Sequence, residues 1–362
     1  MKIAMIGLRG IPSKDGGVEV AVGELAPLLV EEGLNVTVYC RTNYTDKNIK
    51  NFKRVRLIYY PTIVTKHLEA IVHTFISTIH ALFQGFHIIH FHADGNALFC
   101  WLPRLFGIKT VVTLHGQDWQ RAKWGKFSKF ILKLGEHIGV YLSSKTISVS
   151  SKIIDYYKGK KLVHIPNGIP KTSRVSNSQI LEKFGIENYI LYLGRLVPEK
   201  GIHLLIRAYN QLKIDDQLVI VGDATNTTKY LDELKLLSKN NHNIIFTGGL
   251  FGPDKQALIE NARLFVMPSL LEGMPIVLLE MMNQGIPCLV SNIPEILEVV
   301  GKTEKYCTTF SNNNILDLKS KILNTLNDVD LIQKKASYGK SLVQTKYDWK
   351  VIAKQTHQVY LS

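Results

Sequence analysis

The sequence predicts an α/β protein with two doubly wound parallel-sheet domains, and three observations support this fold class. Short apolar segments typical of buried strands alternate along the whole chain with segments of helical periodicity. With 362 residues, of which 46% are hydrophobic and 20% are charged, the chain is long enough for two domains with separate cores. A polar stretch rich in Ser, Thr and Asn, from Pro170 to Ser178, interrupts the pattern near its middle. We therefore expect domains at residues 1–170 and 171–345, followed by a helix at 346–362.

Each expected strand is a short run of mostly apolar residues. In the first domain, strands are expected near Lys2–Gly7, Asn35–Arg41, Arg56–Tyr60, His87–Phe91, Thr110–His115, Thr146–Val149 and Val163–Ile165. In the second domain, they are expected near Tyr189–Leu193, Gln217–Val221, Asn243–Thr247, Leu264–Met267, Cys288–Val290 and Tyr306–Thr308. Helical patterns fill the intervals, which is typical of parallel strands joined by crossover helices.

Charge is unevenly distributed along the chain. Residues 1–170 hold 22 Lys and Arg against 11 Asp and Glu, so they carry +11 of the formal net charge of +14. This favours an anionic partner such as membrane lipid, nucleic acid or a charged substrate, although a lysine-rich proteome would explain part of the excess.

The four cysteines lack metal-ligand spacing, which indicates buried thiols in a reducing compartment. The N-terminal apolar run is too short for a signal peptide, and no uninterrupted run of about twenty apolar residues predicts a transmembrane helix.

A first motif follows the expected strand Tyr189–Leu193. The strand ends at Gly194, where the chain must turn, so Arg195 and Lys200 leave the carboxyl end of a strand. Open α/β sheets bind their ligands at this edge. Two cations at this edge are suited to bind a pyrophosphate, because an arginine guanidinium donates paired hydrogen bonds and a lysine ammonium supplies a compact positive charge.

A second motif follows the expected strand Leu264–Met267. Proline is well placed in the first turn of a helix, and backbone N–H groups at such a helix start can bind a phosphate. The residues expected to surround the phosphate are Gly273, Met274, Pro275 and Ile276. Glu272 precedes the helix and Glu280 lies within it, and carboxylates accept paired hydrogen bonds from the vicinal hydroxyls of sugars and ribose. Each charge alone is explained equally well as a surface residue or ion pair, but the set predicts a site for a nucleotide diphosphate joined to a polyol.

Together the two motifs resemble the donor-site signature of glycosyltransferase family 4, whose members are retaining enzymes with the two-domain GT-B fold. The matching pattern is Gly-Arg-x4-Lys-Gly, followed by Pro-Ser-x2-Glu-Gly-x6-Glu-x4-Gly-x-Pro. The resemblance extends through Thr113–Gly116, Ile165–Gly168 and Asn243–Gly248, and so covers essentially the whole chain. It departs at Met281-Met282-Asn283, where the family usually has smaller residues. The resemblance implies two Rossmann-like domains facing a cleft, and a C-terminal helix that crosses back to the first domain.

The loop after the first expected strand, Leu8–Val18, is not a G-x-G-x-x-G dinucleotide loop. Its pair Gly16 and Gly17 can bring backbone N–H groups close to an anion, although a plain tight turn is the alternative. The resemblance implies that this loop contacts the donor phosphates and the acceptor. The particular form of the loop, with Gly10-Ile11-Pro12, resembles a bacterial subgroup that contains rhamnosyltransferases of surface-polysaccharide assembly.

The segment from His115 to Lys133 combines aromatic and basic residues. A lone histidine at a strand end is more often structural, but the resemblance implies that His115 reaches the donor sugar. The residues assigned to the acceptor or to a membrane surface are Asp118, Trp119, Arg121, Lys123, Trp124, Lys126, Lys129 and Lys133. Aromatic and cationic side chains suit an anionic membrane surface, and no nucleic-acid motif accompanies them. The alternative is an ordinary helix with its apolar side in the core and its lysines in water.

The resemblance implies a mechanism in which Arg195, Lys200 and the backbone amides near Met274 stabilise the leaving nucleotide diphosphate in place of a divalent metal. Glu272 and His115 position the sugar. Glu280 holds the ribose. Asp-x-Asp occurs only at Asp328-Val329-Asp330, in a helical region away from the motifs, so we expect no metal and no other cofactor.

The sequence therefore predicts a metal-independent, retaining hexosyl or deoxyhexosyl transferase that uses a nucleotide-diphosphate sugar. The expected acceptor is a lipid-linked saccharide of capsule or O-antigen assembly, and the expected location is the cytoplasm, peripherally on the inner membrane face. Two alternatives remain open: a nucleotide-sugar epimerase of the same architecture, and a non-catalytic module that binds a sugar or a membrane. The sequence does not determine the sugar, the base, the linkage or the oligomeric state.

Overall fold

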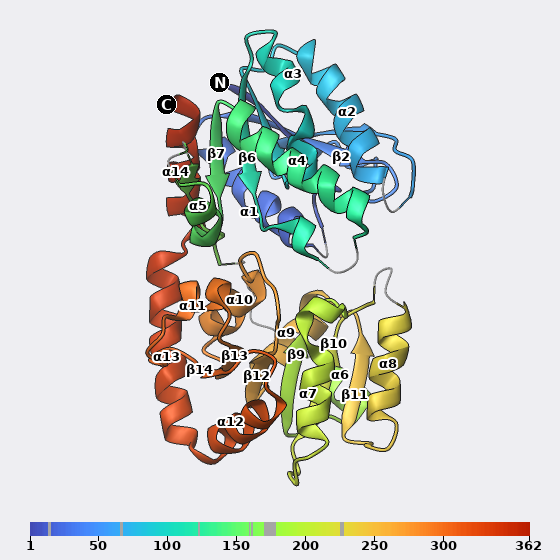
Figure 1. Ribbon diagram of the computed structural model, residues 1–362, viewed down its shortest axis with the longest axis vertical. Coiled ribbons are helices and arrows are strands. Elements are labelled where there is room, and N and C mark those ends of the chain that lie inside the picture. The colour runs from blue at the N-terminus through green and yellow to red at the C-terminus, as the bar shows by residue number, and fades with distance from the viewer. Residues whose placement is uncertain are drawn as a thin grey trace. The chain divides into compact units, whose positions relative to one another are not determined.

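The computed structural model describes residues 1–13, 16–65, 68–121, 124–158, 160, 162–169, 179–224 and 228–362 (Figure 1). The chain divides into two compact units. Unit 1 consists of Met1–Gly168 together with Tyr347–Ser362, and unit 2 consists of Ile169–Lys346. The expected domain limits at 170 and 345 lie close to these, while the expected linker at 170–178 lies outside the described residues.

Unit 1 is built on an eight-stranded sheet with the order β3-β4-β2-β1-β5-β6-β7-β8. Its strands are β1 (Lys2–Ile6), β2 (Asn35–Arg41), β3 (Asn51–Phe52), β4 (Val55–Tyr60), β5 (Ile88–His92), β6 (Lys109–Leu114), β7 (Lys145–Ser148) and β8 (Leu162–His164). The strand order reverses direction between β1 and β5, which makes their carboxyl ends the switch point where doubly wound sheets bind ligands.

The expectation of a purely parallel first sheet is wrong at one edge. The short strand β3 pairs antiparallel with β4, whereas the other strand pairs of this sheet are parallel. The connection is a two-residue turn at Lys53 and Arg54, which have φ angles of 47° and 68°. Such hairpin turns favour Asn-Gly or Asp-Gly, so Lys-Arg gives no sequence signal for this one.

Helices surround the first sheet, and the last one comes from the end of the described chain. They are α1 (Gly17–Glu31), α2 (Glu69–Leu82), η1 (Gly95–Phe99), α3 (Trp101–Arg104), η2 (Asp118–Gln120), α4 (Lys126–Leu142), α5 (Ser151–Tyr156) and α14 (Trp349–Leu361). Helix α14 packs against α1, and Lys109 Nζ donates to the carbonyl of Tyr360 at 2.9 Å. The chain thus returns from unit 2 to complete unit 1 with its C-terminal helix.

Unit 2 is built on a six-stranded, wholly parallel sheet with the order β11-β10-β9-β12-β13-β14. Its strands are β9 (Tyr189–Leu193), β10 (Gln217–Val221), β11 (Ile244–Gly248), β12 (Leu264–Met267), β13 (Cys288–Ser291) and β14 (Thr308–Phe310). Its helical elements are α6 (Ile180–Phe184), η3 (Pro198–Lys200), α7 (Ile202–Tyr209), α8 (Thr228–Ser238), α9 (Gly252–Glu260), α10 (Ile276–Gln284), α11 (Pro294–Val300), α12 (Ile315–Asn327) and α13 (Val329–Lys346). The switch point lies between β9 and β12, the two strands that the sequence motifs follow. The predicted fold class of two doubly wound domains is confirmed.

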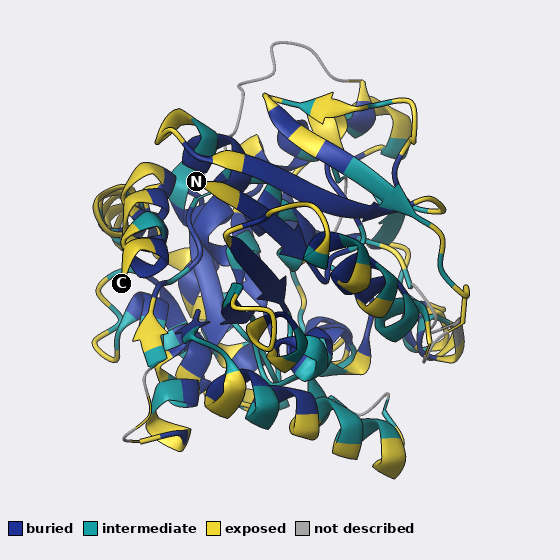
Figure 2. Cartoon of the chain, turned by 90° about the horizontal axis from the view of Figure 1, so that it is seen from above, coloured by how far each residue is buried: buried dark blue, intermediate teal, exposed yellow. Residues whose placement is uncertain are grey.

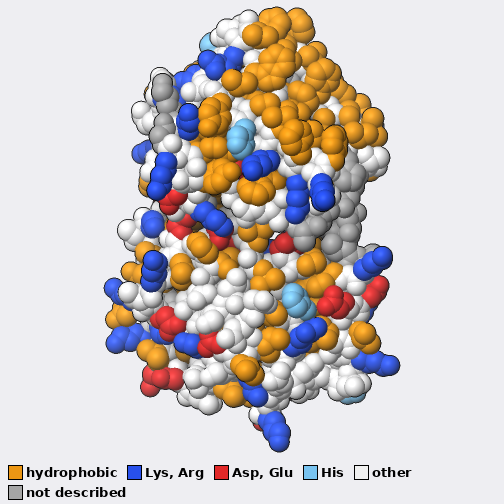
Figure 3. Space-filling model, viewed as in Figure 1, with side chains coloured by type: hydrophobic (Ala, Val, Ile, Leu, Met, Phe, Trp, Pro, Cys, Tyr) orange, Lys and Arg blue, Asp and Glu red, His pale blue; other side chains and the backbone are white. Residues whose placement is uncertain are grey.

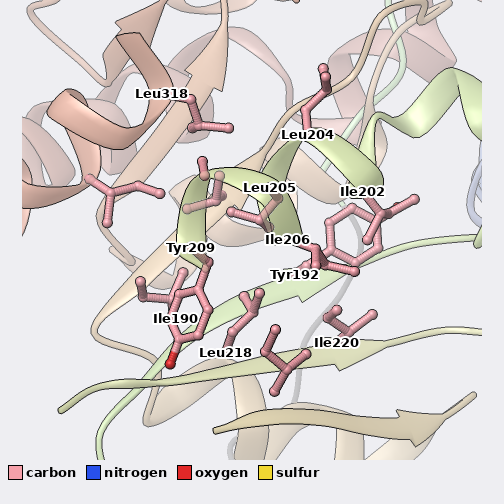
Figure 4. Close-up of a cluster of buried hydrophobic side chains, with 14 of the residues drawn as sticks. Ile190, Tyr192, Ile202, Leu204, Leu205, Ile206, Tyr209, Leu218, Ile220 and Leu318 are labelled. Carbon is pink, nitrogen blue, oxygen red and sulfur yellow. The ribbon is translucent and has the colours of Figure 1, made fainter. Parts of the chain in front are cut away.

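The core of unit 2 is packed between α7 and the sheet. Leu205 and Ile206 of α7 and Tyr192 of β9 are almost completely buried together, as Figure 4 shows. Burial of a leucine or isoleucine side chain stabilises a protein by about 1.5–3 kcal/mol, so this layer holds the first motif firmly in place. The central strands of both sheets are buried, whereas the edge strands β3 and β8 and the outer faces of the helices are partly exposed (Figure 2).

The four cysteines are buried and none forms a disulfide, as the sequence predicted. Burial raises the pKa of the Cys40 and Cys100 thiols to about 12, so both stay protonated at neutral pH. Among the described residues, no helix is both long enough and apolar enough to span a bilayer.

Candidate functional site

The two motifs of unit 2 touch at the switch point of the sheet. The loop of the first motif comes so close to the end of β12 that a Cβ atom on Gly201 would lie 2.0 Å from the carbonyl oxygen of Pro268. The N–H of Leu270 donates to the carbonyl of Glu199 at 2.8 Å. Gly201 has a φ of 67°, so its missing side chain serves both the turn and the close approach.

The charges of the two motifs meet in an ion pair. Lys200 Nζ lies 2.5 Å from Glu272 Oε1, and Ser269 Oγ donates to the same oxygen at 2.7 Å. The side chains of Lys200 and Glu272 are only 18% and 7% exposed. A carboxylate at this depth requires a partner, and Lys200 supplies it. The structure therefore brings together two of the residues that the sequence assigned to catalysis.

Arg195 is exposed in the turn that follows β9. Its carbonyl accepts a hydrogen bond from the hydroxyl of Tyr192 at 3.1 Å, and the next residue, Leu196, donates its N–H to the carbonyl of Asp223 at 3.0 Å. The neighbouring turn after β10 comes equally close, because a Cβ atom on Gly222 would lie 1.9 Å from the carbonyl oxygen of Gly194. The backbone under Arg195 is thus fixed from both sides while its guanidinium lies at the surface.

Helix α10 begins at Ile276, and Pro275 is its N-cap residue, one position before the expected first turn. Gly273 and Met274 form the half-buried turn that leads into it. The first N–H groups of any helix have no partner within the helix, so this end is suited to an anion. These residues lie where the sequence placed them relative to Glu272.

Glu280 lies inside α10 and is only 8% exposed at its side chain. Both of its carboxylate oxygens accept hydrogen bonds from Lys255 Nζ, at 2.6 and 2.8 Å. Lys255 belongs to α9 and was not among the predicted residues. The carboxylate expected to hold a ribose is therefore engaged by a lysine in this structure.

The glycine loop of unit 1 is closed by an ion pair. Arg9 Nε donates to Glu19 Oε1 at 3.1 Å, and the Arg9 guanidinium also lies 4.4 Å from the centre of the Tyr44 ring. A Cβ atom on Gly16 would lie 2.0 Å from Glu19 Oε2, whereas one on Gly17 would meet nothing within 4 Å. The absence of a side chain at Gly16 is thus needed by the ion pair, independently of any ligand.

His115 follows β6 and is one of three neighbouring histidines. Its Nε2 lies 3.2 Å from His92 Nδ1, and His92 stacks on His90 with ring centres 4.2 Å apart. Nδ1 of His90 is hydrogen-bonded to the Tyr360 hydroxyl and its Nε2 to Thr113 Oγ1, each at 2.7 Å. Burial lowers the pKa of His115 to about 4 and that of His90 to about 3. Both imidazoles are therefore neutral at pH 7.

A buried acidic cluster lies next to the predicted acceptor segment. The N–H of Asp118 donates to Asp94 Oδ2 at 2.9 Å, and Trp119 Nε1 donates to Glu136 Oε2 at 3.1 Å. Burial, with the charges of Asp118 and Glu136, raises the pKa of Asp94 well above its usual value. Arg121 pairs with Asp118 at 2.8 Å. Asp118, Trp119 and Arg121 are thus tied into this cluster.

The basic residues beyond this cluster lie on α4, except Lys123, which is outside the described residues. Lys126 and Lys133 are exposed, Lys129 and Trp124 are half-buried, and Lys133 Nζ lies 5.1 Å from the centre of the Trp119 ring. Two large apolar residues of the same stretch are outside the core, because Phe127 is 77% and Phe130 is 62% exposed, whereas Ile131 and Leu132 are half-buried. Helix α4 therefore packs part of its apolar side and exposes two aromatic side chains beside its lysines. No group of three potential ligands for a metal ion occurs among the described residues.

Comparison with known proteins identifies the chain. Residues 15–172 match the family described as Glycosyltransferase Family 4, and residues 174–342 match Glycosyl transferases group 1. The protein belongs to glycosyltransferase family 4.

Several relatives of this glycosyltransferase align with it over most of their length. An uncharacterized glycosyltransferase of Methanocaldococcus jannaschii is 28% identical over 99% of this chain and 98% of its own. A UDP-Gal:alpha-D-GlcNAc-diphosphoundecaprenol alpha-1,3-galactosyltransferase of Escherichia coli is 27% identical over 81% of this chain and 80% of its own. The capsular polysaccharide biosynthesis glycosyltransferase CapM of Staphylococcus aureus is 24% identical over 69% of each chain. The solved structure of Anabaena HepE with UDP and glucose superposes with a TM-score of 0.81 at 19% identity, covering 99% of both chains, and confirms the fold.

Several residues near the predicted site of this glycosyltransferase were missed from sequence. Lys255 could not be linked to Glu280, because the two residues lie on different helices and share no motif. His92 and Asp94 could have been predicted from the sequence as site residues, since polar residues at the end of an apolar strand are unusual. His92 directly follows the expected strand His87–Phe91 and Asp94 comes two residues later, so the carboxyl end of this strand could have been predicted as a second site.

Proposed function

We propose that this glycosyltransferase moves a hexose or deoxyhexose, with retention of configuration and without a divalent metal, from a nucleotide-diphosphate sugar to a lipid-linked saccharide. The observation that carries the proposal is the contact between the two motifs of unit 2. There Arg195, the Lys200–Glu272 ion pair and the start of α10 gather at the switch point of the sheet. This is where a doubly wound sheet binds a nucleotide.

The positive groups at this site are suited to stabilise the leaving group of the transfer reaction. Departure of the nucleotide diphosphate builds negative charge, and Arg195, Lys200 and the first N–H groups of α10 are suited to stabilise it. Glu272, held by Lys200 and Ser269, offers its second oxygen to a sugar hydroxyl. No metal is needed in this scheme, because fixed side-chain and backbone donors supply the positive potential.

The ribose contact requires a change at Glu280. Its carboxylate is held through both oxygens by Lys255 Nζ, and each oxygen has further lone pairs available. We expect the ribose hydroxyls either to share the carboxylate with Lys255 or to displace the lysine. In both cases Lys255 influences nucleotide affinity.

A lipid-linked acceptor at an anionic membrane is supported by the surface of unit 1. Large apolar side chains are exposed on or next to α2, α3 and α4: Phe75, Ile79, Phe83, Trp101, Leu105, Phe106, Phe127 and Phe130. Figure 3 shows hydrophobic side chains gathered over α2 and α3, with lysines and arginines nearby. Apolar side chains beside basic ones suit the interface of an anionic bilayer. The relative in Escherichia coli is named for an acceptor carried on diphosphoundecaprenol.

The donor sugar of the proposed reaction is a hexose or a deoxyhexose. The loop with Gly10-Ile11-Pro12 resembles a rhamnosyltransferase-containing subgroup, so deoxyhexose donors belong in any test. The relative from Staphylococcus aureus is named for capsular polysaccharide biosynthesis, and this favours a surface-polysaccharide acceptor.

A thermal-shift panel of nucleotide-diphosphate sugars, followed by transfer assays with the best donor, tests the proposal. A ligand at a hundred times its dissociation constant stabilises the protein by about 2.7 kcal/mol. We expect one donor to stabilise the protein and to be consumed only when a polyprenyl-diphosphate-linked saccharide is present. Conversion of the donor to an epimer without acceptor would instead establish the epimerase alternative. Binding without hydrolysis or transfer on long incubation would establish a non-catalytic module.

A further inference from the structure

A small, partly open cavity in unit 1 has a volume of about 20 Å³. It is lined by residues of α1, β5, β6, β7 and α14 and by residues 165–167, which follow β8. Its polar lining residues include His92, Thr113, His115 and Trp349. A cavity needs roughly 10–15 Å³ to hold one water molecule, so this one is large enough for a single water.

Two buried nitrogens at this cavity have no hydrogen-bond partner among the described residues. They are Nε2 of His92, whose side chain is 1% exposed, and Nε1 of Trp349, which is 5% exposed. Leaving such a group unpaired costs about 1–3 kcal/mol. Because both residues line the same cavity, one water molecule between them would pair both nitrogens at once.

The indole of Trp349 is held in one place. A Cβ atom on Gly168 would lie 2.5–2.7 Å from three atoms of the indole, so the ring packs flat against the glycine. Trp349 is also the first residue of α14, capped by Asp348, whose side chain accepts the N–H of Lys350 at 2.6 Å. The indole N–H can only donate.

A water that accepts from this fixed donor still has two protons to donate. An unprotonated His92 Nε2 at the same cavity can accept one of them, which leaves the proton of the neutral His92 ring on Nδ1. Nδ1–H then donates across the 3.2 Å contact to Nε2 of His115. The proton of His115 is left on Nδ1, a nitrogen without a partner among the described residues.

We propose that a water in this cavity connects Trp349 to His92, and that His92 is a positioning residue which holds His115 as its Nδ1–H tautomer. His115 thereby presents an N–H donor, which suits a hydroxyl oxygen of the donor sugar. The inference rests on the proposed function only for this last contact. His90, fixed by Tyr360 and Thr113, stacks on His92 and holds its ring plane.

Nitrogen-15 NMR of histidine-labelled protein tests the tautomer without any substrate. The His115 signals are assigned by their loss in His115→Gln. We expect the Nδ1–H form of His115 in the wild type, and a mixture with the Nε2–H form in Trp349→Phe and His92→Leu. Val359→Ala is the matched control, because it changes another buried residue of α14 that does not line the cavity, and it should leave the tautomer unchanged.

Kinetics separate a positioning role from a structural one. Orienting partners of metal-bound histidines contribute about 10–100-fold, and we expect kcat to fall about tenfold in His92→Leu and Trp349→Phe. His92→Asn should recover most of kcat, because its amide places an N–H near the position of Nδ1. An Nε2–H form of His115 in the wild type, or an unchanged tautomer in both variants, would overturn the proposal. The expected tautomers without transfer from any nucleotide sugar would uphold the relay and overturn the proposed function.

Discussion

The two units have similar topologies but place different chemistry at their switch points. In unit 1, the carboxyl ends of β5 and β6 carry His92 and His115, which are neutral, buried or half-buried and hydrogen-bonded to each other. In unit 2, the segments beyond β9 and β12 carry charges that meet as Lys200–Glu272, and Glu280 of the helix after β12 pairs with Lys255 of the helix after β11. Neutral imidazoles can be buried without counter-ions, whereas carboxylates need them.

Because of this difference, we expect the two units to respond differently to pH and to the loss of a charged side chain. Unit 1 depends on the protonation of histidines, because burial disfavours the charged form of an imidazole. Unit 2 depends on fixed charges, so a single substitution removes both a cation for the substrate and the partner of a carboxylate.

Loss of the charged groups of unit 2 should affect the rate most. We expect Arg195→Ala and Lys200→Ala each to lower kcat by about 10²–10³, since that is the loss typical of one transition-state donor. Lys200→Ala should also lower stability more than Arg195→Ala, because among the described residues it leaves Glu272 with Ser269 as its remaining side-chain partner, whereas Arg195 is exposed. Steady-state kinetics and urea unfolding measure both effects.

The matched control for these variants is Arg263→Ala. It removes the ion pair of Arg263 with Asp216 in the same unit but away from both motifs, and should leave kcat within a few-fold of wild type. Near-normal kcat in both Arg195→Ala and Lys200→Ala would contradict the assignment of the phosphate site.

The histidines of unit 1 should make its stability fall in acid. The pKa of His90 is about 3 in the folded protein and about 6.5 when unfolded, so below pH 6.5 the unfolded state binds the extra proton. We expect His90→Gln to reduce the loss of stability between pH 6 and 4 by about 1.4 kcal/mol per pH unit. All four tryptophans lie in unit 1, so urea unfolding followed by tryptophan fluorescence reports on that unit.

His242→Gln provides the comparison for this measurement, because His242 is exposed in unit 2. It should leave the pH dependence of the fluorescence transition unchanged. Equal slopes for the wild type and His90→Gln would show that His90 is charged in the folded protein.

The basic surface of unit 1 should bind anionic vesicles in a salt-sensitive manner. Each lysine near such a surface contributes about 1 kcal/mol, and the attraction decays within a Debye length. Changing Lys123, Lys126, Lys129 and Lys133 together to glutamine should release the protein from phosphatidylserine-containing vesicles in co-sedimentation at low salt. The control variant changes four exposed lysines of unit 2 to glutamine and so alters the net charge by the same amount: Lys183, Lys235, Lys239 and Lys302. Equal loss of binding in both sets would show only a general effect of net charge.

The smallest expected effect is that of a chelator. If side-chain and backbone donors stabilise the leaving diphosphate, transfer should continue unchanged in excess EDTA. A loss of activity that manganese restores would mean that the charged groups of unit 2 do not replace a metal.

Most of the fold could be predicted because its strands are continuous apolar runs. β9, β10 and β12 begin and end at the predicted residues, since each lies in the middle of a sheet and is buried on both faces. The limits of strands at the edges of the sheets were predicted less accurately. β14 begins two residues later than expected, where Thr308 pairs with Leu289, because edge pairing is decided by the neighbouring strand.

The candidate site could be predicted only where residues share a motif. Lys200 and Glu272 belong to two recognisable motifs, and their contact follows from the adjacency of β9 and β12. The engagement of Glu280 by Lys255 and the contact of His92 with His115 depend on packing between separate elements, which spacing along the chain does not reveal. The exposure of Phe127 and Phe130 likewise depends on how α4 packs, and not on its composition.

Unit 1 is made of two pieces of chain, and this has a consequence for synthesis. The ribosome makes Met1–Gly168 first, then all of unit 2, and only then Trp349, which lines the cavity beside His92. At about 5–20 residues per second, the early piece waits on the order of 10–40 s for its last helix. Unit 2 is continuous and can fold in that interval. If unit 2 binds the nucleotide as proposed, a nascent chain acquires its donor site before α14 completes the surroundings of His92 and His115.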